Sequence, residues 1–321
     1  MNRFTLAAAA LFAVFVPFVA AQTYPKQPVR MIVPYSPGTG ADILARTIGQ
    51  KLTDRWGQTV VVENKVGASG TIGTAVAAHA APDGYTLLMN VNSHVINKCV
   101  FKDAQYDPVK DFTPVTMTAW GRLLLVVHPS THIETLKDFI KEAKAHPGKL
   151  NYTSPGIGTP HHVAMELFKL QTGTDLFHVP HKSSAGAVTD MVGGQVQTMF
   201  VPIHNGLPHV RAGRLNALGM GSPKRAPSAP EIPTLLEQGV KGVNTDMWYG
   251  VLTPAGVSRD IVSKVMRDVQ AVLASPEFRA SLAKQGLEVT TSTPEEFAKL
   301  IRTDLARWQK VVDYAKISAS Q

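Results

Sequence analysis

The sequence has a single cysteine, no long apolar run in its interior and no block of basic residues. Cys99 is the only cysteine among 321 residues, which excludes a disulfide scaffold within the chain and a thiolate metal cluster. Beyond the N-terminus, no stretch approaches the roughly 20 apolar residues that a membrane span needs. The basic residues outnumber the acidic ones by 32 to 24 but are scattered. We therefore predict no nucleic-acid partner and a weak attraction for anionic small molecules.

The N-terminus has the pattern of a secretory signal peptide. Arg3 is followed by an apolar stretch, by Pro17 and by the small residues Ala20 and Ala21. About 15 apolar residues interrupted by a proline are too few for a membrane anchor, whereas a basic start and a small-residue exit favour cleavage. We predict that residues 1–21 are removed near Ala21 and that the protein is exported.

After this segment, short apolar strands alternate with helix-like stretches, a pattern typical of α/β sheets with crossover helices. The predicted strands are 29–33, 59–63, 86–89, 123–127, 176–179, 196–201 and 215–220, and the predicted helices are 41–56, 71–78, 135–146, 160–172 and 185–192. From Ser258 onward the pattern is helical, and a capping box at Thr293–Glu296 begins the last helix.

The length suggests about two domains at roughly 150 residues each. A break near 119–122 and the proline-rich segment 223–233 bracket a middle section of the chain. We predict that residues 123–228 form one lobe, inserted into a discontinuous lobe made of 22–122 and 229–321.

Three predicted strands are joined to the following helices by turns rich in glycine and hydroxyl residues: Ser36–Asp42, Gly67–Thr71 and Ser154–Pro160. Each turn places unpaired backbone N–H groups at the positive end of a helix, which suits an anion. Such turns lie at the carboxyl ends of strands, where α/β proteins bind ligands. One turn alone is explained by chain geometry, but three of similar chemistry predict a ligand cleft.

The motifs of common enzymes are incomplete in this sequence. Gly38 and Gly40 begin a dinucleotide fingerprint, but its third small position is Ile43. There is no phosphate-binding loop of the GxxxxGK[ST] type and no GxSxG nucleophile elbow. His162 and Glu166 are four residues apart without the second histidine of a zinc-protease helix. We therefore predict no catalytic residue, no metal and no cofactor.

Ordered short motifs recur along nearly the whole chain after the signal peptide. They include Val33-Pro34-Tyr35-Ser36-Pro37-Gly38, Pro82-Asp83-Gly84-Tyr85-Thr86-Leu87-Leu88, Gly156-Ile157-Gly158-Thr159-Pro160-His161-His162, Gly193-Gly194-Gln195-Val196 and Trp248-Tyr249-Gly250. On these motifs the sequence resembles the TctC/Bug family of periplasmic solute-binding proteins, the receptors of tripartite tricarboxylate transporters.

The resemblance implies a type II periplasmic-binding fold, α/β, in which two lobes close on a small organic carboxylate. It also implies a periplasmic location and membrane transporter subunits as partners, and we expect a monomer. The carboxylate is expected between the turns Ser36–Asp42 and Ser154–His161. The expected ligand-binding residues are Tyr35, Ser36, Gly38, Thr39, Gly40, Asp42, Ser69, His94, Arg122, Ser154, Gly156, Gly158, Thr159, His161, Lys182 and His204.

Individual roles are expected to differ within this set. Asp42 is expected to orient the first turn or cap its helix rather than to touch an anion, and Trp248 and Tyr249 to wall the cleft or to fill the core. Arg122 either extends to solvent or faces the cleft and pairs with the far end of a dicarboxylate. Thr39 replaces a glycine common in the family, so the ligand of a relative does not transfer directly.

The predicted function is capture of a small carboxylate, aliphatic or aromatic, and its delivery to a tripartite tricarboxylate-type transporter. Two alternatives use the same fold. A sensor component would report the ligand to a membrane receptor, and an exported enzyme would need a base and a nucleophile that the sequence does not provide.

Overall fold

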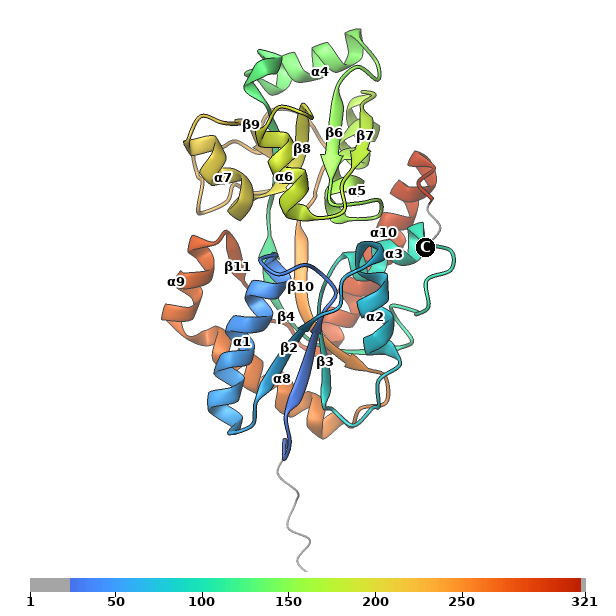
Figure 1. Ribbon diagram of the computed structural model, residues 1–321, viewed down its shortest axis with the longest axis vertical. Helices are drawn as coiled ribbons and strands as arrows, with labels where there is room; N and C mark the ends of the chain where they lie inside the picture. The colour runs from blue at the N-terminus through green and yellow to red at the C-terminus, as the bar shows by residue number, and fades with distance from the viewer. Residues whose placement is uncertain (1–23, 319–321) are drawn as a thin grey trace, which may run out of the picture.

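The computed structural model describes residues 24–318, so the predicted signal peptide and its cleavage near Ala21 lie outside the described residues. Two β-sheets form the centres of two lobes, drawn one above the other in Figure 1. Lobe 1 contains the sheet β11-β4-β10-β3-β1-β2, and lobe 2 contains the sheet β7-β6-β8-β5-β9. Among the described residues, no helix is both long enough and apolar enough for a membrane span.

Lobe 1 combines three parallel strands with antiparallel neighbours. β1, β2 and β3 are parallel, and β10 runs antiparallel to β3 and β4. Its strands are β1 (Val29–Val33), β2 (Val60–Asn64), β3 (Thr86–Val91), β4 (Phe112–Gly121), β10 (Met247–Pro254) and β11 (Leu287–Val289). Its helices are α1 (Gly40–Trp56), the short 3₁₀ helix η1 (Ala68–Gly70), α2 (Thr71–Ala78), α3 (Ser93–Val100), α8 (Arg259–Ala274), α9 (Pro276–Lys284) and α10 (Pro294–Ala315).

Lobe 2 repeats this plan on a smaller scale. β7, β6 and β8 are parallel, and β5 is antiparallel to β8 and β9. Its strands are β5 (Leu123–Val127), β6 (Asn151–Ser154), β7 (Phe177–Pro180), β8 (Thr198–Pro202) and β9 (Asn216–Met220). Its helices are the 3₁₀ helix η2 (Pro129–Thr131), α4 (Leu136–Ala145), α5 (Pro160–Thr172), α6 (Ser184–Val192) and α7 (Ile203–Arg211).

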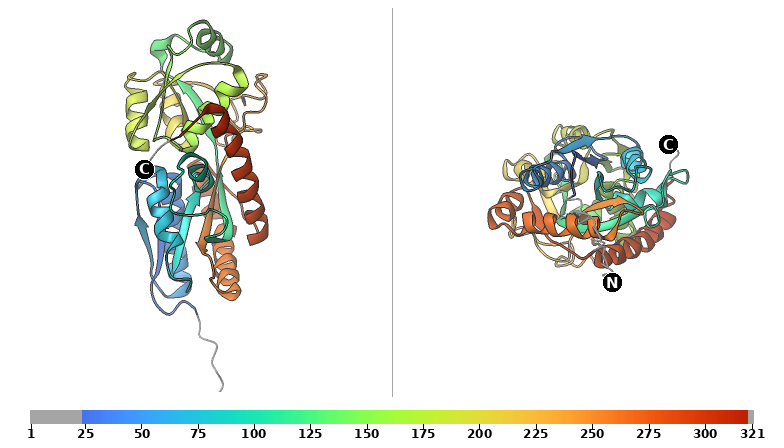
Figure 2. Two further views of the ribbon diagram at one scale, coloured as in Figure 1. Left: turned by 90° about the vertical axis from the view of Figure 1, so that its right-hand side faces the viewer. Right: turned by 90° about the horizontal axis from the view of Figure 1, so that it is seen from below.

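Both faces of the lobe 1 sheet are covered, because successive residues of a strand point to opposite faces. Met31, Leu87 and Val251 belong to the core cluster that includes α1 and α8. Their neighbours Ile32 and Leu88 belong to the cluster that includes α3 and α10. The second cluster also contains side chains of α5, so α10 packs on both lobes, as the left view of Figure 2 shows.

Most of these elements were predicted from the sequence, and a few were missed. The helix predicted at 160–172 is α5, and the predicted capping box is present, with the Glu296 N–H donating to Thr293 Oγ1 at 3.1 Å. The strands β4, β10 and β11 and the helices α3 and α7 were not predicted. Gly206 and Pro208 lie inside α7, and both residues disfavour a helix on their own.

The two lobes are joined where the chain crosses at Gly121-Arg122 and again before Met247. The division of the chain at residues 228 and 229 remains a prediction. In the structure, the chain beyond this point still follows lobe 2, because the Leu235 N–H donates to the Met220 carbonyl at 2.9 Å. The return to the lobe 1 sheet begins with β10.

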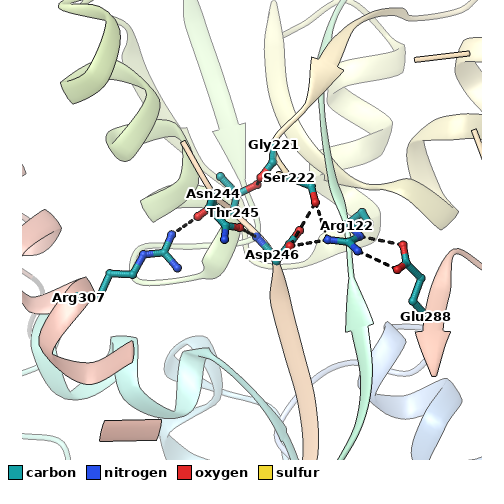
Figure 3. A network of polar contacts seen from close by, with 8 residues as sticks. All are labelled: Arg122, Gly221, Ser222, Asn244, Thr245, Asp246, Glu288 and Arg307. Atoms are coloured by element: carbon teal, nitrogen blue, oxygen red, sulfur yellow. Dashed lines mark hydrogen bonds and ion pairs between the residues drawn. The ribbon is translucent and has the colours of Figure 1, made fainter. Parts of the chain in front are cut away.

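A buried ion network ties the two crossings together (Figure 3). The Arg122 guanidinium donates Nε and Nη2 to the two carboxylate oxygens of Glu288, both at 2.8 Å, and Nη1 to Asp246 Oδ2 at 2.5 Å. The Arg122 and Asp246 side chains are only 10% and 12% exposed. Burial raises the pKa of Asp246 although Arg122 favours its ionised form. Arg122 therefore neither reaches into solvent nor faces a ligand, because β11 and the second crossing occupy its donors.

We expect the substitution Arg122→Met to destabilise the protein strongly. It leaves the Asp246 carboxylate buried without its counter-charge, which costs about 3–5 kcal/mol in comparable pairs. Urea unfolding of the full mature chain measures the effect. The double variant Arg122→Met/Asp246→Asn should recover part of the loss, because it removes the stranded charge.

The exposed pair Arg225–Glu237, whose side chains are 43% and 46% exposed, provides the control. Arg225→Met should change the free energy of unfolding by no more than about 1 kcal/mol. Equal unfolding midpoints for Arg122→Met and the unaltered protein would show that the network does not hold the crossings.

Candidate functional site

A cavity of about 140 Å³ lies between the lobes. Lobe 1 lines it with Pro34, Tyr35, Ser36, Thr39, Gly40, Ala41, Val66, Gly67, Ala68, Ser69, Gly70, Val91, Ser93, Met247 and Tyr249, and lobe 2 with Pro155, Thr159, Pro160, His161, Lys182, Ser183, Ser184, Pro202, His204 and Asn205. Among these described residues, Lys182 is the one with a formal charge at neutral pH, and none is a carboxylate. A second space of about 480 Å³ adjoins the cavity, because both are lined by Ser36, Thr39 and His204; this adjoining space is called the mouth below.

The N-termini of six helices converge on this cavity. α1, α2 and α3 follow the parallel strands of lobe 1, and α5, α6 and α7 follow those of lobe 2. Parallel strands bring their carboxyl ends to one edge, so the helices that follow them all begin there. The first-turn N–H groups lack acceptors within their helices and carry partial positive charge. The cavity is therefore suited to an anion without many basic side chains.

The turns before α1 and α5 have matching geometry. Gly38 and Gly158 have φ angles of 80° and 79°. The Thr39 Oγ1 hydroxyl donates to the Ser36 carbonyl at 2.9 Å, and the Thr159 Oγ1 hydroxyl to the Gly156 carbonyl at 2.7 Å. Each hydroxyl thus binds its own loop instead of the first helical amides, and neither helix has a side-chain cap. The amides at both helix starts remain available to a ligand.

In each turn, the N–H of the glycine donates a hydrogen bond to a side chain four residues further along the chain. The Gly38 N–H donates to Asp42 Oδ2 at 3.0 Å, and the Gly158 N–H donates to His162 Nδ1 at 3.2 Å. Burial opposes ionisation of Asp42, but hydrogen bonds from Arg46, Gly38 and Asn64 lower its pKa. The prediction that Asp42 orients the first turn is confirmed, and its charge is already satisfied by these donors.

The structure brings many of the predicted ligand-binding residues together around the cavity, namely Tyr35, Ser36, Thr39, Gly40, Ser69, Thr159, His161, Lys182 and His204. Gly38 lies at the mouth. Asp42, His94, Arg122, Ser154, Gly156 and Gly158 do not line the cavity. Arg122 is in the network between the lobes, and Asp42 lies behind its turn, so both act away from the ligand space.

His94 is a core residue and not a cavity residue. It is fully buried, with Nε2 2.9 Å from the Pro108 carbonyl and its ring 4.7 Å from the ring of Phe112. Burial lowers the pKa of His94 to about 4, so the imidazole is neutral at physiological pH. The sequence placed it near the ligand because it follows β3, but its side chain turns toward the core behind the sheet.

The second turn contains three predicted ligand-binding residues that determine its conformation and do not line the cavity: Ser154, Gly156 and Gly158. Ser154 Oγ is buried and lies 2.8 Å from His178 Nε2 and 3.0 Å from the Gly156 carbonyl. This serine–histidine pair has no access to the cavity, so it supports the loop. A Cβ on Gly158 would come within 3.2 Å of Phe101 in lobe 1, which shows how closely this turn meets the opposite lobe.

A direct hydrogen bond also joins the lobes beside the cavity. Ser69 Oγ, from the turn before α2, donates to the Ile157 carbonyl of lobe 2 at 2.6 Å. Asn97 Nδ2 donates to the Ser69 carbonyl at 3.0 Å and fixes the position of this turn. The third glycine turn therefore contributes a contact between the lobes as well as part of the cavity wall.

Several cavity residues were missed by sequence reasoning. Ser93 and Asn205 lie in the first turns of α3 and α7, the helices that were not predicted. Ser93 Oγ is fully buried and has no hydrogen-bond partner among the described residues. Tyr249, in contrast, was expected either to wall the cleft or to fill the core, and it lines the cavity. It approaches Gly40 so closely that a Cβ there would lie 2.5 Å from its hydroxyl. The feature of the sequence that could have identified Ser93 and Asn205 is their position shortly after a strand, β3 or β8.

Known proteins are similar to this chain over nearly its whole length. Residues 44–317 match the model of TctC, the tripartite tricarboxylate transporter family receptor. The chain is 34% identical to protein BugT of Bordetella pertussis (strain Tohama I) over 296 residues, 92% of this chain and 91% of BugT.

Two solved structures support the fold. Rpa4515 of R. palustris, solved with adipate, is 33% identical, with a TM-score of 0.87 over 93% of this chain and 100% of that one. MatC (Rpa3494) of Rhodopseudomonas palustris, with bound malate, is 30% identical, with a TM-score of 0.83 over 90% and 100%. The predicted two-lobe α/β fold is confirmed by these likenesses. The chain belongs to the TctC family of tripartite tricarboxylate transporter receptors, the family that includes the Bug proteins.

Proposed function

We propose that this protein binds a small dicarboxylic acid in the periplasm and delivers it to a tripartite tricarboxylate-type membrane transporter. The observation that carries the proposal is the convergence of six helix N-termini on a cavity lined by no carboxylate. The relatives solved with adipate and malate support a carboxylate ligand, and both of those acids carry two carboxyl groups. The exported, monomeric state and the transporter partner are parts of the same proposal.

One carboxylate of the ligand is held between the starts of α1 and α5. The amides of Ala41 and His161 approach it from opposite lobes, and the loop hydroxyls fix both turns in place. Amides that are already oriented in a desolvated cleft bind a carboxylate at little reorganisation cost. Because the two half-sites belong to different lobes, the ligand stabilises the closed arrangement over an open one.

A binding panel tests this function. We expect succinate, malate or adipate to raise the melting temperature in a dose-dependent manner, because a ligand that binds only the folded state stabilises it by mass action. Calorimetry then gives the affinity, and mass spectrometry of natively purified protein identifies any acid that copurifies. If no mono- or dicarboxylic acid shifts the melting temperature or gives heat, and none copurifies, the proposal is wrong.

The matched turns give a sharper prediction. We expect Thr39→Val and Thr159→Val each to weaken binding of the best acid by about 1–2 kcal/mol, roughly tenfold, because each loop loses the hydroxyl bond that positions its amides. Calorimetry measures the affinity, and thermal unfolding checks that stability changes little.

Thr135→Val is the matched control. Thr135 Oγ1 accepts from the Asp138 N–H at 3.1 Å and caps α4, far from the cavity. Its loss should cost about 1 kcal/mol of stability and leave affinity unchanged. Wild-type affinity in both cavity variants would mean that these turns do not hold the carboxylate.

A further inference from the structure

We propose that His161 and His204 form the subsite for the second carboxylate of the ligand and take up a proton when a dianion binds. This inference rests on the proposed carboxylate-binding function and names the groups that distinguish a diacid from a monoacid. The histidine pair takes the role that the sequence analysis considered for Arg122, the cation at the far end of the ligand, since Arg122 is bound to Glu288 and Asp246.

The two imidazoles reach the same cavity from neighbouring helices of lobe 2. His161 is the second residue of α5 and His204 the second residue of α7, and both line the cavity. Both ring nitrogens of His161 and Nε2 of His204 are buried without a hydrogen-bond partner among the described residues. Buried polar atoms are rarely left unpaired in folded proteins. A ligand carboxylate would supply the missing acceptors.

Three other histidines among the described residues have protein partners, whereas His209, in the adjoining space, also has a buried Nδ1 without one. His94 contacts the Pro108 carbonyl, His178 contacts Ser154, and the Gly158 N–H donates to His162. Those three imidazoles support the fold with their ring nitrogens. The nitrogens of His161 and His204 have no such structural task.

The surroundings keep both imidazoles neutral in the empty cavity. Burial lowers the pKa of His161 to about 3, with a further contribution from His204, and lowers the pKa of His204 to about 4. The groups that line the cavity with the pair are Lys182 beside α6, Asn205 of α7, and Tyr35 and Tyr249 of lobe 1. His204 also lines adjoining spaces with His209, Arg211 and Lys284. Burial raises the pKa of both tyrosines, so they are uncharged. Among these lining residues, no carboxylate compensates an imidazolium.

A ligand dianion changes this balance. Its second carboxylate favours the charged form of an adjacent imidazole, and an imidazolium offers two N–H donors where the neutral ring offers one. The pKa of the pair is therefore higher in the complex than in the empty protein, and binding consumes protons. By linkage, affinity for the dianion rises as the pH falls through the pKa of the complex and levels off only below the pKa of the empty protein. A monoanion held only by the helix starts gives no such dependence.

Calorimetry on the full mature chain tests this inference. The probes are the diacid of the panel that binds most tightly and its monomethyl ester, which has the same length and one charge fewer. Titrations between pH 6 and 8 in two buffers with different heats of ionisation give both affinity and proton uptake. At pH 6 the diacid is mostly a dianion, but its second carboxyl titrates above an ordinary carboxyl because the first is already charged. The protonation of the free diacid in the same buffers is therefore measured and subtracted.

We expect the diacid to bind about tenfold more tightly at pH 6 than at pH 8 with measurable proton uptake, and the ester to show neither effect. His161→Gln and His204→Gln should each remove the pH dependence and lower diacid affinity at pH 6 about tenfold, while ester affinity stays within about twofold. His146→Gln is the control, because His146 directly follows α4 and is paired with Glu142 at the surface. It should leave every value unchanged.

The outcomes separate this inference from the function on which it rests. If diacid and ester bind with equal, pH-independent affinity, the acid-binding function stands and the histidine subsite is wrong. The subsite is also wrong if Lys182→Met alone abolishes the preference for the diacid while both histidine variants retain it. If neither diacid nor ester binds, the proposed function itself fails.

Discussion

The direction of the parallel strands is the constraint from which the site follows. In each lobe three parallel strands end at the edge that faces the other lobe, so each helix that follows a strand begins there. Oriented amides thereby converge on the cavity between the lobes, in an arrangement suited to an anion. This arrangement needs few ionised side chains, in agreement with a cavity to which Lys182 contributes the formal charge among the described residues. The glycine turns are the local means of bringing these amides close to a ligand.

The strongest cation near the crossings is used for structure and not for recognition. Arg122 joins the end of β4 to β11 and to the segment before β10, with partners 166 and 124 residues away. Withdrawing this guanidinium toward a ligand would leave a partly buried carboxylate unpaired. Because Arg122 is fixed in this network, the proposed discrimination among acids would depend on side chains inside the cavity, where His161, His204 and Lys182 are available.

The sequence predicted features whose chemistry is local and missed those that depend on distant contacts. The turns Ser36–Asp42 and Ser154–Pro160 were found because glycine, hydroxyl residues and a following helix occur within a few positions of one another. The role of Asp42 was also predicted, since its partner Gly38 is four residues away. The partners of Arg122 lie far along the chain, and the burial of His94 depends on packing against Phe112 and Trp248. No local pattern contains that information.

The two matching turns are supported by different groups, a carboxylate in lobe 1 and an imidazole in lobe 2. Asp42 holds the first turn with a carboxylate whose charge is satisfied by Arg46 and Asn64, whereas His162 holds the second with an imidazole that burial keeps neutral. Neither support contributes net charge to the cavity, so the amides recognise any carboxylate alike. The residues that lobe 1 adds are uncharged, while lobe 2 adds His161, Lys182 and His204. In the proposed function, lobe 2 therefore recognises the charge pattern of the ligand, and lobe 1 supplies the opposing amides and the shape of the closed cleft.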